Sequence, residues 1–174
     1  MPFFLIIVIL IIIGVATLFL VANYHKLIRY KNEVDEVWPE TDSLMKKRQN
    51  LVPILLQAVR SHARYEQQII DSIDQARSQV AQANNPRDKF LAEANLTASL
   101  QGLFGLASDY PELVSDSDFI ETRAEIIDAE NKIEDAQRLY NIKAKNFNQA
   151  QDLFPTNLVA RLFNFKKLDY LKIR

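Results

Sequence analysis

Cysteine is missing from the 174-residue chain, and glycine occurs only three times. The lack of cysteine excludes disulfides, thiolate zinc sites and cysteine nucleophiles, although it does not identify a compartment. Few glycines leave few turn signals, and no run of alternating β-branched residues predicts a strand. Together these features indicate an all-α domain with long helices. The formal net charge of −1 lacks the strongly basic character of a nucleic-acid-binding protein, so no nucleic-acid partner is expected.

Charge is absent from residues 3–22, which read FFLIIVILIIIGVATLFLVA. Twenty helical residues rise about 30 Å, the thickness of the hydrocarbon core of a bilayer. A cleaved signal peptide is the alternative, but it needs a basic start and a small residue before the cut. Only Met1 and Pro2 precede this run, and Leu20 stands where a small residue is wanted. We therefore expect a transmembrane anchor over residues 1–23.

Basic residues follow the apolar run and do not precede it. Lys26, Arg29 and Lys31 come directly after it, at the expected membrane interface. Because positive charge near a span is retained in the cytoplasm, the N-terminus is expected outside and the rest of the chain in the cytoplasm.

A heptad pattern predicts one long helix over residues 118–152. Asp118 and Glu121 have the spacing of a capping box at its start. Large side chains recur every seven residues, with mostly small ones three positions later, which lets another helix approach closely. The large positions are Phe119, Ile126, Ile133, Tyr140, Phe147 and Phe154.

A second heptad pattern begins just after the apolar run and continues to residue 69. One seam holds Leu27, Val34, Thr41, Arg48, Leu55, His62 and Ile69, and the other holds Tyr30, Val37, Leu44, Leu51, Ala58 and Tyr65. Pro39 and Pro53 predict kinks, because proline removes a backbone donor and crowds the preceding turn. This helix is too long for its neighbours, so it either projects from the bundle or breaks between residues 60 and 68.

Turn signals divide the remaining chain at residues 83–88, 110–118 and 153–157. The fold class is therefore all-α, with an N-terminal transmembrane helix running into an antiparallel bundle of three to four long helices. We expect an anchor (1–23), a helical bundle (24–157) and a basic, aromatic C-terminal tail (158–174).

Metal and catalytic patterns are missing from the sequence. Neither His25 nor His62 has a glutamate three residues before it, and no zinc, EF-hand or nucleophile-elbow motif occurs. His62 falls on a core seam, where a hydrogen-bonded structural histidine is expected. No catalytic residue, metal ligand or cofactor is therefore predicted.

Four carboxylates lie close together in the long helix, and their helical faces separate them. Asp128 and Asp135 are expected in solvent, and Glu134 at a flank. Glu130 lies at the edge of the core stripe, where a buried carboxylate needs a partner. Arg48 is the candidate for a structural ion pair with Glu130. The alternative is that both side chains extend to water.

The tail mixes basic and aromatic residues. Arg161, Phe163, Phe165, Lys166 and Lys167 would suit an interfacial segment that contacts anionic lipid or a partner. Alternatively, the aromatic residues cap one end of the bundle, which is the interpretation we favour.

The order of several motifs resembles the LemA family of bacterial membrane-anchored proteins. The resemblance is carried by IRYKNEVDEVW, LMKKRQNLVPILLQAV, LTASLQGLFGLASDYPELVSDSDF, AENKIEDAQRLYN and FNQAQDLFPTNLVARLFNFK. Thr156 and Asn164 stand where the family usually has glycine, and Pro39 where it usually has a residue of an unbroken helix. The resemblance implies an α-helical bundle on an N-terminal anchor in the bacterial inner membrane, and it implies no enzymatic activity. Some members are associated with membrane protein quality control or membrane remodelling.

Together these features predict a membrane-anchored, non-enzymatic scaffold or adaptor that self-assembles into a homo-oligomer through coiled-coil-like contacts. One alternative is a regulatory subunit of a membrane enzyme such as a membrane-embedded protease, with an integral membrane protein as partner. Another is a protein that binds membrane lipid and organises the membrane.

Overall fold

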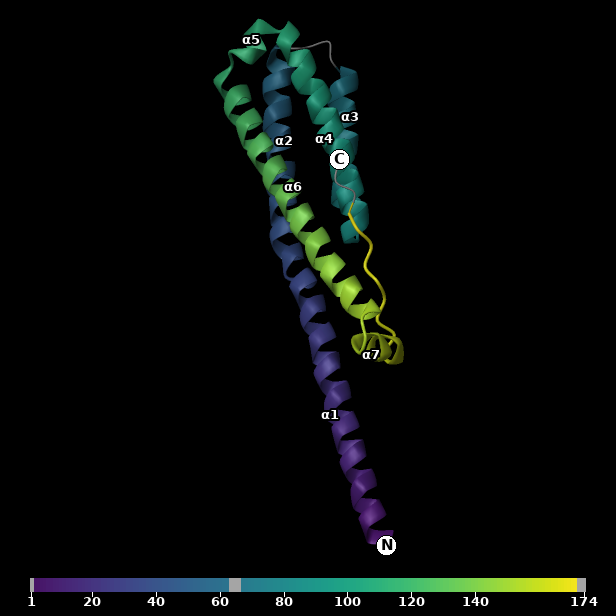
Figure 1. Cartoon of the computed structure of the whole chain (residues 1–174). Coiled ribbons are helices and arrows are strands. Elements are labelled where there is room, and N and C mark those ends of the chain that lie inside the picture. The colour runs from purple at the N-terminus through teal and green to yellow at the C-terminus, as the bar shows by residue number, and fades with distance from the viewer. Residues whose placement is uncertain (1, 63–66, 172–174) are drawn as a thin grey trace. The chain divides into compact units, whose positions relative to one another are not determined.

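The computed structural model describes residues 2–62 and 67–171, and its regular elements there are all helices (Figure 1). The chain is 88% helical, with a long apolar N-terminal helix leading into a helical bundle. The predicted fold class is therefore confirmed.

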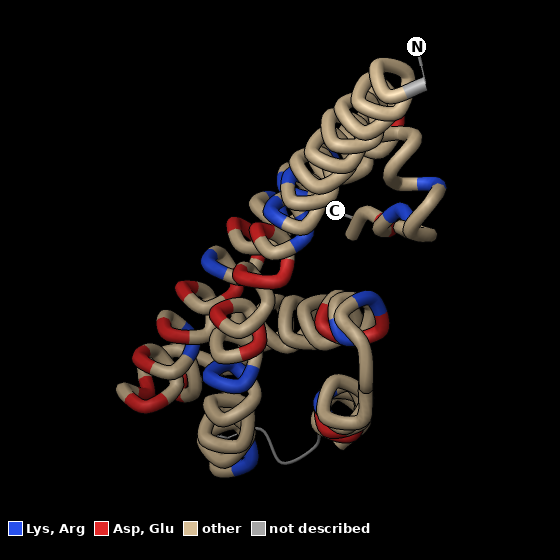
Figure 2. The backbone as a smooth tube through the Cα atoms, turned by 90° about the horizontal axis from the view of Figure 1, so that it is seen from below, with Lys and Arg blue, Asp and Glu red and all other residues tan. Residues whose placement is uncertain are grey.

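Helix α1 (Pro2–Asp35) begins with the uncharged run and is long and apolar enough to cross a membrane. Figure 2 shows its N-terminal turns free of charged residues. Its apolar side chains are exposed in the isolated chain, as is expected of a surface that lipid covers.

A single residue, Glu36, separates α1 from α2 (Val37–His62). The amide of Glu36 still donates to the carbonyl of Asn32 at 2.9 Å, so the interruption is slight. Pro39 lies in the first turn of α2, where a missing backbone donor costs little. The expected disturbance near Pro39 is thus a helix boundary, whereas Pro53 lies inside α2 and the helix continues past it.

The chain reverses direction after α2, and α3 (Gln67–Gln82) and α4 (Pro86–Leu106) form a helical hairpin (Figure 1). Helix α2 ends at His62 and α3 begins at Gln67, so the predicted break between residues 60 and 68 falls on residues 63–66, which lie outside the described part. The predicted turn at 83–88 contains Asn85, whose side chain accepts from the Asp88 amide at 2.9 Å and caps α4.

A 3₁₀ turn η1 (Ala107–Asp109) and a short helix α5 (Pro111–Val114) lead into α6 (Ser117–Asp152). The α6 cap is Asp116, whose carboxylate accepts from the Phe119 amide at 2.9 Å. The predicted cap at Asp118 is therefore wrong by two residues, because the carboxylate of Asp116 already accepts the hydrogen bond of the Phe119 amide at the start of the helix. The predicted end of the helix at residue 152 is confirmed.

Two compact units divide the chain. The unit that we call the anchor unit joins residues 1–37 with 139–170, and the bundle unit joins 38–138 with 171–174. The division into 1–23, 24–157 and 158–174 stays a prediction, because it concerns the membrane and not the contacts within the chain.

The core of the bundle unit is built from α2, α3, α4 and the first part of α6. The first predicted seam is confirmed along α1 and α2, where its members from Leu27 to Leu55 are all buried. Phe119 of α6 meets Phe104 of α4 edge to face, with ring centroids 6.4 Å apart. Buried members of this core include Val52, Leu55, Leu56, Val59, Ile70, Ile73, Leu96, Leu100, Leu103, Leu113 and Ile126.

The core of the anchor unit is smaller and lies where α1, the end of α6 and α7 (Thr156–Leu162) meet. Leu27 of α1 packs with Ala150, Val159 and Ala160, and Tyr24, Tyr30 and Phe165 cover them. The last predicted heptad position, Phe154, is exposed, because α6 ends two residues earlier.

Candidate functional site

Arg48 and Glu93 form an ion pair in the interior of the bundle unit. Arg48 comes from α2 and is 1% exposed, while Glu93 comes from α4 and is 3% exposed. The Nη2 atom of Arg48 contacts the Oε2 atom of Glu93. Two opposite charges removed from water must compensate one another, and this contact joins α2 to α4 in the interior of the unit.

Other contacts of the guanidinium also go to α4. Its Nη1 donates to the Thr97 hydroxyl at 2.7 Å, and its Nη2 donates to the Glu93 carbonyl at 3.2 Å. Burial lowers the pKa of Arg48 to about 10, and the negative charge of Glu130 opposes this shift. The guanidinium is therefore protonated at neutral pH.

Glu130 is not the carboxylate in contact with Arg48. It is half-buried on α6 and acts on the guanidinium through its charge, while Glu93 holds the direct ion pair. The predicted partner of Arg48, Glu130, is therefore wrong, and Glu93 is the partner instead. The alternative that both side chains extend to water is wrong for Arg48, which is fully buried.

A cavity of about 190 Å³ lies beside this pair. Arg48, Glu93, Thr97 and Glu130 line it, together with the apolar side chain of Ile133. The Nε of Arg48 and the Oε1 of Glu93 are buried beside it without a hydrogen-bond partner. Buried polar atoms of this kind lower stability relative to an apolar core, so the pair is expected to serve register or recognition and not stability alone.

A second ion pair joins α2 and α4 nearer the start of the unit, where Lys89 contacts Asp42. Hydrogen bonds from Lys46 and then from Lys89 lower the pKa of Asp42 below its usual value. The ammonium of Lys89 also lies 5.8 Å from the ring centroid of Trp38. The pair thus repeats, at a less buried place, the α2–α4 contact made by Arg48.

The other acidic residues of the long helix lie at the surface, as predicted. Asp128 and Asp135 are exposed, and Lys132 donates to Asp128 at 2.7 Å. Arg138 donates to Glu134 at 2.6 Å. Such exposed pairs contribute at most about 1 kcal/mol each, so this cluster is a solvated helix face.

No group of three His, Asp or Glu side chains within residues 2–62 and 67–171 is placed to hold a metal ion. His25 is exposed at the start of the first polar stretch of α1. The side chain of His62 lies outside the described residues.

The predicted interface residues of α1 are all exposed. Lys26 and Arg29 face away from the core, and Lys31 pairs with Asp35 one turn later at 2.6 Å. Three exposed cations therefore follow the apolar run within nine residues.

The tail folds back on α1 and α6 within the anchor unit. The ring centroids of Phe163 and Phe165 lie 4.8 and 5.9 Å from that of Tyr24, and Phe165 also contacts Phe147. Phe165 therefore packs between α1 and α6 in the anchor unit, and the predicted capping of the bundle stays a prediction. Phe163, Arg161, Lys166 and Lys167 remain exposed.

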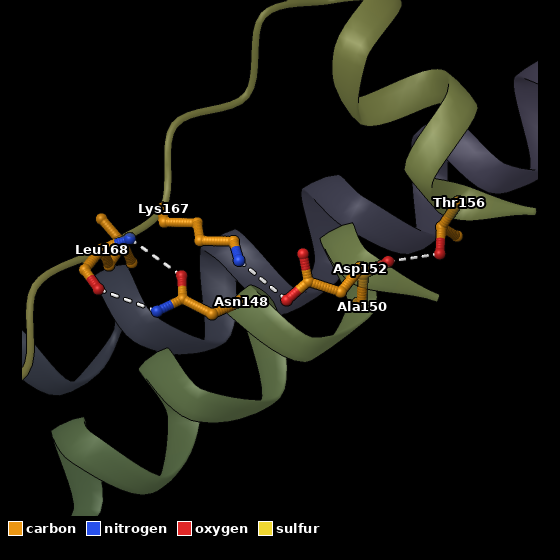
Figure 3. A network of polar contacts seen from close by, with 6 residues as sticks. All are labelled: Asn148, Ala150, Asp152, Thr156, Lys167 and Leu168. Carbon is orange, nitrogen blue, oxygen red and sulfur yellow. Dashed lines mark hydrogen bonds and ion pairs between the residues drawn. The ribbon is translucent and has the colours of Figure 1, made fainter. Parts of the chain in front are cut away.

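Polar contacts fasten the tail to the end of α6 (Figure 3). The side chain of Asn148 donates to the Leu168 carbonyl and accepts from the Leu168 amide, both at 2.8 Å. Lys167 pairs with Asp152 at 2.8 Å. The Thr156 hydroxyl donates to the carbonyls of Ala150 and Leu153 and so closes the turn after α6.

Sequence reasoning missed Glu93 and Asn148. Glu93 precedes Leu96 and Leu100 by three and seven residues, so the helical spacing of the α4 core already placed a carboxylate among buried positions. Asn148 follows the heptad residue Phe147 directly, and no local pattern marks its bond to residue 168.

Comparison with known proteins identifies the family. No curated protein matches the chain, but the model of the LemA family matches residues 37–174. The match begins where α2 begins and covers the bundle, the long helix α6 and the tail. The chain therefore belongs to the LemA family.

Proposed function

We propose that this chain is a membrane-anchored, non-enzymatic scaffold or adaptor that assembles with copies of itself through helix–helix contacts. In this proposal α1 crosses the inner membrane of a bacterium once. The three cations after the apolar run keep the helical domains in the cytoplasm.

Exposed apolar residues on α6 carry the proposal. In the bundle unit, Ile120 and Ile127 are 53% and 39% exposed and lie seven residues apart on one helical face. In the anchor unit, Leu139 and Ile142 are exposed at a spacing of three. Single exposed apolar residues are normal, but pairs at helical spacing form a stripe that another helix can cover.

A second copy of the chain suits this stripe. A heptad-spaced face is self-complementary when two identical helices meet about a twofold axis. Anchoring in one membrane also confines the copies to a plane, which raises their effective concentration. A contact too weak to form between freely diffusing chains can therefore form there.

Cysteine crosslinking in native membranes tests the assembly, because the chain has no cysteine of its own. The variant Ile127→Cys should yield a dimer of the chain under mild oxidation. Asp71→Cys is the matched control, since it is exposed on α3 of the same unit and away from the α6 face. Equal yields at the two positions would refute a specific interface, and a crosslink to a different, multi-span protein would favour the regulatory-subunit alternative.

A charge variant tests the same surface by another route. Ile120→Glu with Ile127→Glu should lower the mass of the assembly in nanodiscs and leave the helical content unchanged, because both side chains are already exposed. An unchanged mass would place the interface elsewhere.

A further inference from the structure

Helix α7 has one buried face and one exposed apolar face. Thr156, Val159 and Ala160 are buried, while Leu158 and Leu162, four residues apart, are 52% and 64% exposed. Phe163 continues the exposed face, and Leu153 and Phe154 are exposed in the turn before the helix. This is a large apolar surface for a helix of seven residues.

The place of α7 along α1 gives the depth of this surface. The inner face of α7 packs on Leu27, and Phe163 meets Tyr24. Helical rise places Tyr24 about 3 Å and Leu27 about 8 Å beyond Ala22, the last residue of the apolar run. The headgroup layer on each side of a bilayer is about 5–8 Å thick. Figure 1 shows α7 beside α1, next to the end of α6.

Two exposed cations, Arg161 and Lys166, lie beside the same surface. They line a hollow of about 760 Å³ together with Gln151, Asn157 and the ion pair of Lys167 with Asp152. The Nε2 donor of Gln151 is buried beside this hollow without a hydrogen-bond partner. Phosphate oxygens accept from cations and amide donors of this kind.

We propose that α7 lies in the headgroup layer beside the point where α1 leaves the bilayer, with Leu158, Leu162 and Phe163 among the lipid chains. Arg161 and Lys166 then bind the phosphates of anionic lipid. An apolar face beneath basic residues is the composition of an interfacial helix. This inference rests on the proposed membrane anchoring by α1.

Lipid suits this surface better than a second protein, because it is the material that already surrounds α1 at that depth. A protein partner would have to displace lipid from the foot of the anchor. The basic residues around the hollow also match the negative phosphates of anionic lipid.

Depth-dependent quenching in the full-length protein tests the position of α7. Single cysteines at residues 158 and 162 (L158C, L162C) carry an environment-sensitive dye in phosphatidylcholine vesicles. Lipids brominated near the headgroup or deep in the chain act as quenchers. Ala16→Cys lies within the apolar run, and Asn32→Cys lies about 15 Å beyond it by helical rise, so both serve as rulers on α1.

The shallow quencher should remove most of the fluorescence at residues 158 and 162, the deep quencher that at Ala16→Cys, and neither should affect Asn32→Cys. Quenching at Ala16→Cys without quenching at L158C and L162C overturns the placement of α7 but keeps the anchor. Loss of quenching at Ala16→Cys instead overturns the anchoring itself. A dye at residue 158 that is shielded from water yet not quenched would show that protein covers this face, and the lipid proposal would fail.

Anionic lipid tests the charges. Adding phosphatidylglycerol to the vesicles should increase the quenching at L162C by the shallow quencher. Added salt should reverse this gain in quenching, because it screens exposed charges. Arg161→Gln with Lys166→Gln should abolish this gain and keep the quenching in neutral lipid. The matched control, Lys47→Gln with Lys132→Gln, removes two exposed lysines of the bundle unit and should keep the gain. A gain that survives Arg161→Gln with Lys166→Gln refutes headgroup binding.

Discussion

Replacing Arg48 by methionine tests the buried ion pair most directly. Methionine keeps a long, unbranched side chain in the core, so the main change is the loss of the guanidinium. Glu93, 3% exposed, then keeps a buried carboxylate with no cation against it. Breaking a buried pair in this way costs about 3–5 kcal/mol.

The double variant Arg48→Met with Glu93→Leu removes both charges and should recover most of that loss. Replacing a whole buried pair by apolar residues is often neutral or stabilising by about 1–4 kcal/mol. The resulting coupling between Arg48 and Glu93 should reach at least about 3 kcal/mol. Glu130 makes no direct ion pair, so Glu130→Gln should cost less than about 1 kcal/mol and show little coupling to Arg48.

Urea unfolding of the full chain in detergent micelles measures these energies. Trp38 is the single tryptophan, and its ring lies 6.1 Å from that of Phe90 in the bundle unit, so its fluorescence reports the unfolding of that unit. Circular dichroism provides a second probe of the same transition. A larger coupling of Arg48 to Glu130 than to Glu93 would refute the assignment of the partner.

Three further predictions follow from local contacts. Hydrogen bonds, that from Lys46 foremost, lower the pKa of Asp42, so its contribution is present above the unfolded value of 3.8 and lost as pH falls through the lower folded pKa. Asp42→Asn should therefore reduce stability in urea titrations at pH 7 by about 0.5–1 kcal/mol, and the difference should vanish in strong acid. Asn148→Ala removes both bonds to Leu168, so hydrogen exchange of the Leu168 amide should accelerate about tenfold or more. Asn164 has φ 54°, in the left-handed region, so Asn164→Gly should be neutral or slightly stabilising, and Asn164→Val should lower the thermal midpoint at a cost of about 1–2 kcal/mol.

The helices and their buried faces follow from the sequence because burial on a helix is periodic. Thr41, Arg48 and Leu55 share one seam by spacing alone, and all three are buried. The same periodicity separates Asp128 from the core without any knowledge of neighbouring helices. Asn164 is a related case, since the glycine usual in the family already indicates a backbone with positive φ.

The partner of Arg48 does not follow from the sequence, because it depends on the register between helices. Glu93 and Glu130 both lie near core positions of their own helices, and periodicity cannot choose between them. The choice depends on how closely α4 and α6 approach α2, which is set by side-chain packing over the whole core. The bond between Asn148 and Leu168 escaped prediction for a similar reason, since it joins a helix to a tail that has no repeat.

The buried pair also bears on assembly, because stability and a single register are different requirements. Heptad seams of similar apolar residues can pack in more than one register, and a buried polar pair penalises the wrong ones. If Arg48 and Glu93 select one register in the bundle unit, they hold the helix face that carries Ile127 in one orientation. The Arg48→Met, Glu93→Leu variant should then be as stable as the parent chain, yet Ile127→Cys in that background should crosslink less and to more varied products. Unchanged crosslinking would show that the pair contributes nothing to the presentation of this face, and that apolar packing alone sets the register.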